Sequence, residues 1–183
     1  MALHLNSCAC CGDMLAARTA PRLTRRGLFG MAAAAATLLP GMARAGSGNY
    51  EALLLTCIDP RMPEKTLAYM RERHLVGQYS QVAMAGAGIA VVAPAFEKWR
   101  PMFWENLAAS IQLHHIPKVI VLDHRDCGAC AIAFGKDAMA TPEKETATHQ
   151  AAIKEFRAQM ATRHPGLAVE AGLMALDGSV QAL

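Results

Sequence analysis

The stretch KVIVLDHRDCGAC (residues 118–130) joins a strongly apolar segment to a cluster of reactive side chains. Its first seven residues form a short apolar run with polar flanks, which predicts a buried β-strand. His124 and Cys127 follow in the spacing H-x-x-C, where the strand runs into a predicted helix at about 127–134. Reactive residues at the end of such a strand are typical of binding sites in α/β proteins.

Strands and helices alternate along the rest of the chain. Strands are predicted at 50–56, 80–85, 118–124 and 167–176, and helices at about 63–74, 101–115, 127–134 and 142–163. Proline stands at or near the start of three of these helices, and Asp177-Gly178 marks a turn after the last strand. Because the strands are apolar without alternation, we expect an α/β fold with a mostly parallel central sheet flanked by helices.

Composition and charge limit the possible functions. The chain has 183 residues, of which 53% are apolar and 18% charged, as in one globular domain. The formal net charge is +3, and the first 45 residues hold five arginines against one aspartate, which leaves 13 basic and 14 acidic side chains in 46–183. This near-neutral body gives no indication of a nucleic-acid surface.

The first 45 residues have the pattern of an export signal. Arg25 and Arg26 are followed by a short Ala/Leu stretch and by a small-x-small cleavage site at Ala43-Arg44-Ala45. The pattern predicts a twin-arginine signal, handled by the export machinery and leading to the periplasm. The apolar stretch is shorter than the roughly 20 residues of a membrane span, so no stable membrane insertion is expected. The alternative is an uncleaved, Ala-rich amphipathic tail; either way, residues 46–183 are predicted to form a single catalytic domain.

The six cysteines divide between these two parts of the chain. Three lie in the leader, where they either bind a metal or are discarded with it: Cys8, Cys10 and Cys11. The other three lie in the predicted domain: Cys57, Cys127 and Cys130. An odd number of cysteines in an exported domain argues against a pure disulfide framework and indicates a thiolate with another task.

A second reactive cluster, CIDPR (57–61), follows the first predicted strand. If strand 80–85 lies on one side of strand 50–56 and strand 118–124 on the other, the two clusters meet at the switch point of the sheet. The side chains that would converge are two thiols, an imidazole and a carboxylate: Cys57, Cys127, His124 and Asp59. This is a tetrahedral ligand set suited to zinc.

CIDPR and the later HRDCGA (124–129) resemble the motifs C-x-D-x-R and H-x-x-C-G of the β-class carbonic anhydrases. QVAMAGAGIAVV (81–92) is similar to the glycine-containing strand and turn of that family, and the resemblance covers most of residues 50–135. It implies one Zn2+ per subunit, at least a homodimer, and reversible hydration of CO2 to bicarbonate by zinc-bound hydroxide. The implied zinc ligands are Cys57, His124 and Cys127.

The resemblance also implies that Asp59 and Arg61 form a catalytic dyad. Asp59 either holds the hydroxide by a hydrogen bond or, in a closed state, binds zinc itself. Arg61 can clamp Asp59 in a charge-assisted pair and keep it off the metal. Pro60, which lacks an N–H, stands where the family usually has serine.

Other functions remain open at this point. A related hydrolase acting on COS or CS2 would use the same zinc site, and so would a zinc-binding protein without turnover. CGAC (127–130) also has the C-x-x-C spacing of a thiol–disulfide oxidoreductase, although that chemistry needs neither His124 nor Cys57. We expect Cys130 to be a small buried hydrophobe and Asp126 to be a carboxylate on a surface turn.

Overall fold

The computed structural model describes residues 47–183. The predicted export signal, with Cys8, Cys10 and Cys11, lies outside these residues. Its cleavage and the start of the domain at residue 46 therefore stay predictions.

A five-stranded sheet with the strand order β2-β1-β3-β4-β5 runs through the described part of the chain. Its strands are β1 (Ala52–Thr56), β2 (Tyr79–Ala83), β3 (Lys118–His124), β4 (Ala168–Met174) and β5 (Val180–Ala182). The first four are parallel, and β5 pairs antiparallel with β4. Leu55 of β1 pairs with Val82 of β2 on one side and with Val121 of β3 on the other. The second and third strands thus lie on either side of the first, which is the condition under which the two reactive clusters meet.

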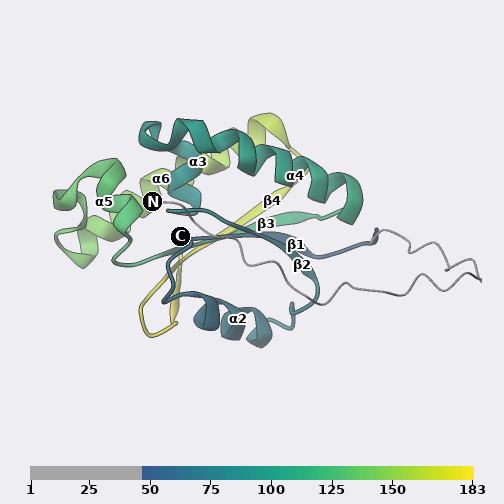
Figure 1. Ribbon diagram of the computed structural model, residues 1–183, viewed down its shortest axis with the longest axis horizontal. Coiled ribbons are helices and arrows are strands. Elements are labelled where there is room, and N and C mark those ends of the chain that lie inside the picture. Colours follow the sequence, from purple (N-terminus) through teal and green to yellow (C-terminus); the bar gives the residue numbers. More distant parts are fainter. Residues whose placement is uncertain (1–46) are drawn as a thin grey trace, which may run out of the picture. The chain divides into compact units, whose positions relative to one another are not determined.

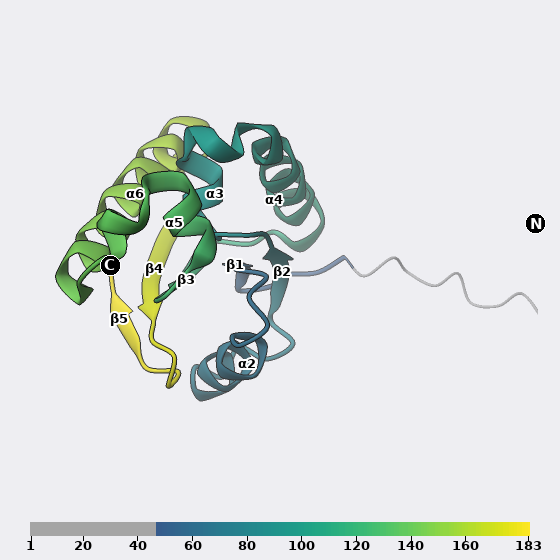
Figure 2. The same cartoon turned by 60° about the vertical axis from the view of Figure 1, so that its left-hand side comes forward.

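Helices cover both faces of this sheet, which confirms the predicted α/β class. The helices are α2 (Pro63–Glu72), α3 (Gly88–Val92), α4 (Arg100–His114), α5 (Gly128–Phe134) and α6 (Pro142–Arg163), with 3-10 turns η1 (Pro94–Trp99) and η2 (Lys136–Met139). Helix α2 lies on one face, and α3, α4 and α6 lie on the other (Figures 1 and 2). Helix α6 begins as its sequence predicts, because the Thr141 hydroxyl accepts a hydrogen bond from the Lys144 N–H and Pro142 occupies the first turn. Within residues 47–183, no helix combines the length and apolarity needed to cross a bilayer.

The core has two parts, one on each face of the sheet. Leu55 of β1 packs in the larger part, to which Ile153 and Phe156 of α6 contribute. Leu54 packs in the smaller part with Met70 of α2. Since neighbouring residues of one strand are buried on opposite faces, the strand shows no alternation of apolar and polar residues.

The structure also corrects the predicted element list. The strand predicted to be the last is followed by β5, because the Asp177-Gly178 turn closes a hairpin rather than ending the sheet. The three residues of β5 are too few to show a strand pattern. Helix α3 and both 3-10 turns were not predicted either, since the glycines at 86 and 88 indicated only a turn.

Candidate metal centre

The two reactive clusters meet at the carboxyl ends of β1 and β3, as the strand order requires. Cys57 follows β1 directly, His124 is the last residue of β3, and Cys127 immediately precedes α5. The two sulfur atoms and one ring nitrogen of His124 all lie within 4.8 Å of one another. The structure thus brings together the three residues that the sequence predicts as metal ligands.

His124 offers one ring nitrogen to the interior of this cluster. Its Nδ1 lies 2.8 Å from the carbonyl oxygen of Arg125, which can only accept, so Nδ1 carries the hydrogen. Its Nε2 is buried and has no hydrogen-bond partner among residues 47–183. A buried polar atom without a partner is costly, and a metal ion is one partner that would satisfy it.

The charge of the cluster also favours a cation. The pKa of Cys57 is lowered to about 4, mainly by a hydrogen bond from the Cys127 thiol. His124 and the Gly86 N–H, which lies 3.2 Å from the sulfur, lower it further, whereas burial opposes the shift. The hydrogen bond between the two sulfurs raises the pKa of Cys127, so they share one negative charge. Burial opposes protonation of His124, but Cys57, the Arg125 carbonyl and Asp59 together outweigh it and raise the pKa of His124. A cluster of two sulfurs and an imidazole that attracts positive charge is a suitable ligand set for a zinc ion.

Asp59 and Arg61 form a fork beside these three side chains. Arg61 donates from Nε to Oδ1 of Asp59 at 2.9 Å and from Nη2 to Oδ2 at 2.7 Å. These hydrogen bonds hold the pKa of Asp59 well below its usual range. Oδ2 of Asp59 lies 3.9 Å from Nε2 of His124, so the carboxylate borders the cluster while it is paired with Arg61.

Pro60 helps to form this fork. The Met62 N–H donates to the Asp59 carbonyl at 3.1 Å, which closes a turn with Pro60 in its second position. Proline is favoured there, and its missing N–H is not needed by the turn. The Asp59 side chain also accepts from the Arg61 N–H at 2.9 Å. The proline that departs from the expected motif therefore fits the turn that folds Arg61 back onto Asp59.

Asp126 lies on the surface, as expected, and is also paired with Arg61. Its side chain is 72% exposed, yet Oδ2 accepts a hydrogen bond from Nη1 of Arg61 at 2.7 Å. Its carbonyl oxygen accepts another from Nη2 of Arg61 at 3.0 Å. The switch-point placement of the two clusters was the signal that could have predicted this pair.

Cys130 does not belong to the cluster of possible metal ligands, Cys57, His124 and Cys127. It is fully buried in the larger apolar cluster, as predicted, and burial raises its pKa to about 12. Within residues 47–183, none of Cys57, Cys127 and Cys130 forms a disulfide. The burial and raised pKa of Cys130 are those of a thiol that packs as a small apolar side chain.

A cavity of about 370 Å³ opens beside Cys127, next to η2 and the start of α6. Cys127 lies in its wall, together with Asp126, Lys136 and Glu145. Of the three clustered side chains, only Cys127 belongs to the lining of this cavity, which also has charged side chains.

Comparison with known proteins relates this chain to one family. Residues 48–170 match the sequence profile of a family described as putative carbonic anhydrase. An uncharacterized protein of Rickettsia conorii is 33% identical over 129 residues, which are 70% of this chain and 69% of that protein. An uncharacterized protein of Rickettsia bellii is 31% identical over 129 residues, which are 70% of this chain and 79% of that protein.

Solved structures share the fold at lower identity. The carbonic anhydrase of Streptococcus mutans has a TM-score of 0.50 and 18% identity, with 88% of this chain and 99% of that chain covered. The β-carbonic anhydrase of Coccomyxa, solved with acetazolamide, has a TM-score of 0.51 and 18% identity, with 87% and 82% covered. Similarity at this identity establishes the common fold.

Proposed function

This chain belongs to the putative carbonic anhydrase family, and on that premise we propose that it is a zinc-dependent carbonic anhydrase that interconverts CO2 and bicarbonate. The observation that carries the proposal is the convergence of Cys57, His124 and Cys127, with a buried and unpartnered Nε2 on His124. Three protein ligands of these types are typical of a catalytic zinc site that keeps one position open for water or substrate.

The proposed chemistry assigns separate tasks to the metal and to the dyad. Bound zinc would lower the pKa of a water molecule from about 15.7 to about 7, which supplies hydroxide at neutral pH. Asp59 is proposed to accept a hydrogen bond from the attacking oxygen and so to orient it toward CO2. Arg61 holds the carboxylate in place by the fork of two hydrogen bonds. In a closed state, Asp59 would instead give up its hydrogen bonds to Arg61 and serve as a ligand of the metal.

The proposal also covers location and assembly. The twin-arginine signal in residues 1–45 would take the domain to the periplasm, which rests on the sequence pattern alone. Replacing Arg25 and Arg26 together by lysine should then block export, and sequencing the N-terminus of the exported protein should place cleavage after Ala45. We also propose at least a homodimer, which light scattering coupled to size-exclusion chromatography tests.

The experiment that tests the function uses the full chain and its Asp59→Ala variant. We expect one zinc per chain in both proteins by elemental analysis, because Asp59 is paired with Arg61 rather than needed as a ligand. We expect stopped-flow CO2 hydration in the wild type and a loss of about 10²- to 10⁴-fold in Asp59→Ala. Stoichiometric zinc without CO2 hydration would overturn the anhydrase activity. Turnover of COS or CS2 by that protein would then identify it as the related hydrolase.

A further inference from the structure

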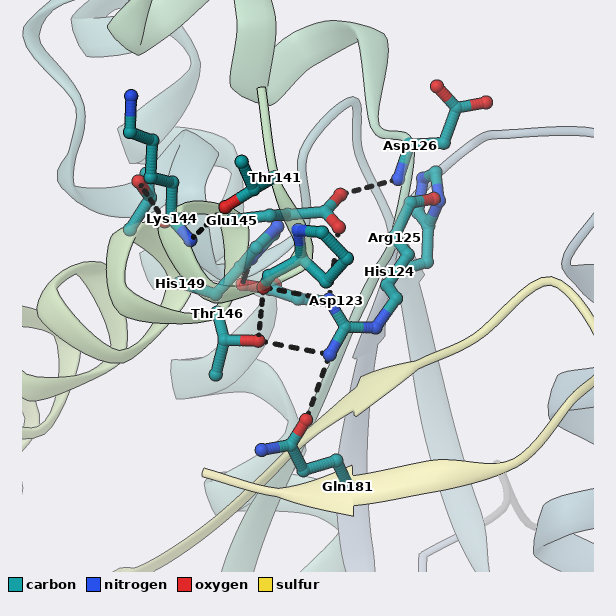
Figure 3. Close-up of polar contacts among 12 residues, drawn as sticks. Asp123, His124, Arg125, Asp126, Thr141, Lys144, Glu145, Thr146, His149 and Gln181 are labelled. Carbon is teal, nitrogen blue, oxygen red and sulfur yellow. Dashed lines mark hydrogen bonds and ion pairs between the residues drawn. The ribbon is translucent and has the colours of Figure 1, made fainter. Parts of the chain in front are cut away.

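Helix α6 directs two buried polar side chains toward the end of β3. Glu145 and His149 lie one helical turn apart and are 7% and 0% exposed. Both contact the segment from Asp123 to Asp126, which surrounds His124 and precedes Cys127 (Figure 3). Acidic side chains are seldom buried without partners, and here the partners of both side chains belong to the segment beside His124.

His149 binds the residue that precedes His124. Its Nδ1 lies 2.8 Å from Oδ2 of Asp123, and both side chains are buried. The other carboxylate oxygen of Asp123 accepts a hydrogen bond from the Gly88 N–H at 2.9 Å. Asp123 therefore connects α6 to the first residue of α3.

This connection extends to Cys57 through the turn before α3. Gly86, two residues before Gly88, donates its N–H to Sγ of Cys57 at 3.2 Å. Gly86 has φ +88°, and Ala87 has φ +45°, which is unfavourable for a residue with a side chain. Such a backbone persists only when its surroundings fix it, and the Asp123–Gly88 hydrogen bond is one such constraint.

Glu145 fixes the two residues between His124 and Cys127. Its Oε1 accepts a hydrogen bond from the Asp126 N–H at 2.6 Å, and its Oε2 accepts one from Nη1 of Arg125 at 3.0 Å. Asp126 has φ +56°, so it also needs support from its surroundings. The Arg125 carbonyl that receives Nδ1–H of His124 belongs to the same short segment.

We propose that Glu145 and His149 are positioning residues that hold the three zinc ligands, Cys57, His124 and Cys127, in place, an inference that rests on the proposed zinc site. Each of the three ligands is reached by one or two hydrogen bonds and by the backbone of adjacent residues. His149 acts through Asp123 on His124 and, by way of Gly88 and Gly86, on Cys57. Glu145 acts through Arg125 and Asp126 on His124 and Cys127. Groups of this kind orient the ligands of a metal, and their loss typically costs about 10- to 100-fold in metal affinity.

The test compares disruptive and conservative variants of the full chain. Glu145→Ala removes both accepted hydrogen bonds, whereas Glu145→Gln keeps an acceptor for the Asp126 N–H. His149→Leu removes the donor to Asp123, whereas His149→Asn can place an N–H near the position of Nδ1. Glu155→Gln on the exposed side of α6 is the matched control for the charge change.

Two measurements report on the three proposed zinc ligands without any assay of activity. Zinc affinity is measured by competition with a chromophoric chelator, and donor geometry by the visible spectrum of the Co2+-loaded protein. We expect Glu145→Ala and His149→Leu to lose about 10- to 100-fold in zinc affinity and to alter the cobalt spectrum. Glu145→Gln and His149→Asn should recover most of the affinity with smaller spectral changes, and Glu155→Gln should match the wild type.

Folded Glu145→Ala and His149→Leu proteins with wild-type affinity and an unchanged cobalt spectrum would overturn the inference, even if both unfold more easily. If these two variants do not fold, the conservative pair decides: cobalt spectra identical to the wild type would overturn it. A wild type that binds zinc without hydrating CO2 refutes only the anhydrase activity, and the predicted variant effects would still support the positioning role. A wild type that binds no zinc refutes the zinc site and this inference together.

Discussion

Arg61 and Asp126, 65 positions apart in the chain, form an ion pair in which Nη1 and Oδ2 are 2.7 Å apart. The same guanidinium forms the fork with Asp59, so one arginine joins the loop after β1 to the loop after β3. An exposed ion pair contributes little to stability, typically about 0 to 1 kcal/mol. We infer that the value of this link lies in orienting Asp59 beside the donors.

Arg61→Lys tests this orientation. Lysine keeps the positive charge but cannot form the planar fork, so Asp59 loses its fixed direction. We expect kcat/KM for CO2 hydration to fall by about 10²-fold, as for other misplaced catalytic groups, with the zinc content unchanged. Stopped-flow kinetics and elemental analysis measure the two quantities.

Asp126→Asn is the comparison for that variant, because it leaves the fork between Arg61 and Asp59 intact. Its loss of kcat/KM should be much smaller than that of Arg61→Lys. Equal losses in the two variants, or loss of zinc in Arg61→Lys, would contradict the orienting role.

Cys127→Ala and Cys130→Ala distinguish the proposed metal site from the C-x-x-C redox pair of a thiol–disulfide oxidoreductase. Only the Cys127 sulfur lies within 4.8 Å of the other donors, whereas Cys130 packs in the apolar core. Cys127→Ala should lose stoichiometric zinc, together with the stabilisation of about 2.7 kcal/mol that zinc at 100 times its Kd gives the wild type. Cys130→Ala should retain zinc and lose only about 1 kcal/mol of stability, as for an average core substitution. Zinc retained by Cys127→Ala would argue against the proposed ligand set.

Much of the fold and the donor set could be predicted because they depend on local patterns. Apolar runs mark the four parallel strands, and the alternation with helices fixes their direction. The parallel order then places Cys57 beside His124 and Cys127 at one edge of the sheet. The strand order itself does not follow from local patterns; it was assumed in predicting that the two clusters meet, and the structure has that order.

Glu145 and His149 could not be predicted in the same way. They stand in PEKETATHQ (142–150), where most neighbours are polar and exposed, so the local pattern does not distinguish them. Their burial is decided by the segment from Asp123 to Asp126, which is distant in sequence. Helix α3 was missed for a related reason, since Ala87 adopts a positive φ that only tertiary contacts justify.

Gly88→Ala should destabilise the protein, because a methyl group there has no space. An added Cβ would lie 2.9 Å from Cγ1 of Val121 and 3.0 Å from Cδ1 of Ile153. Overpacking of this kind typically costs about 1–3 kcal/mol. Urea unfolding followed by circular dichroism measures the free energy of unfolding.

Gly128→Ala is the matched control for Gly88→Ala. It lies at the start of α5, and an added Cβ would meet no atom within 4 Å. Alanine favours the helix and restricts the unfolded chain, so we expect a change between zero and about 1 kcal/mol in the stabilising direction. A cost at Gly128 equal to that at Gly88 would contradict the packing argument.

Glu170 of β4 is expected to make the stability of the protein depend on pH. It accepts hydrogen bonds from Nη2 of Arg73 and, at 2.8 Å, from Nζ of Lys118. Burial opposes ionisation, but the two cations outweigh it and lower the pKa of Glu170 in the folded protein. The unfolded chain, with a glutamate pKa of about 4.3, therefore binds the proton more readily than the folded protein does. The stabilisation by this carboxylate is complete above that pH and is lost as the pH falls through the lower, folded-state pKa.

Urea unfolding of the wild type and Glu170→Gln at several pH values checks this prediction. Because the group is partly exposed, the difference in unfolding free energy at pH 7 should be no more than about 1 kcal/mol. It should stay constant down to about pH 5 and then shrink below the unfolded-state pKa of about 4.3. In a Lys118→Gln background the difference should be smaller, because one of the two cations is gone. A difference that grows as the pH falls would mean that Glu170 is destabilised by its surroundings, against the geometry of its two ion pairs.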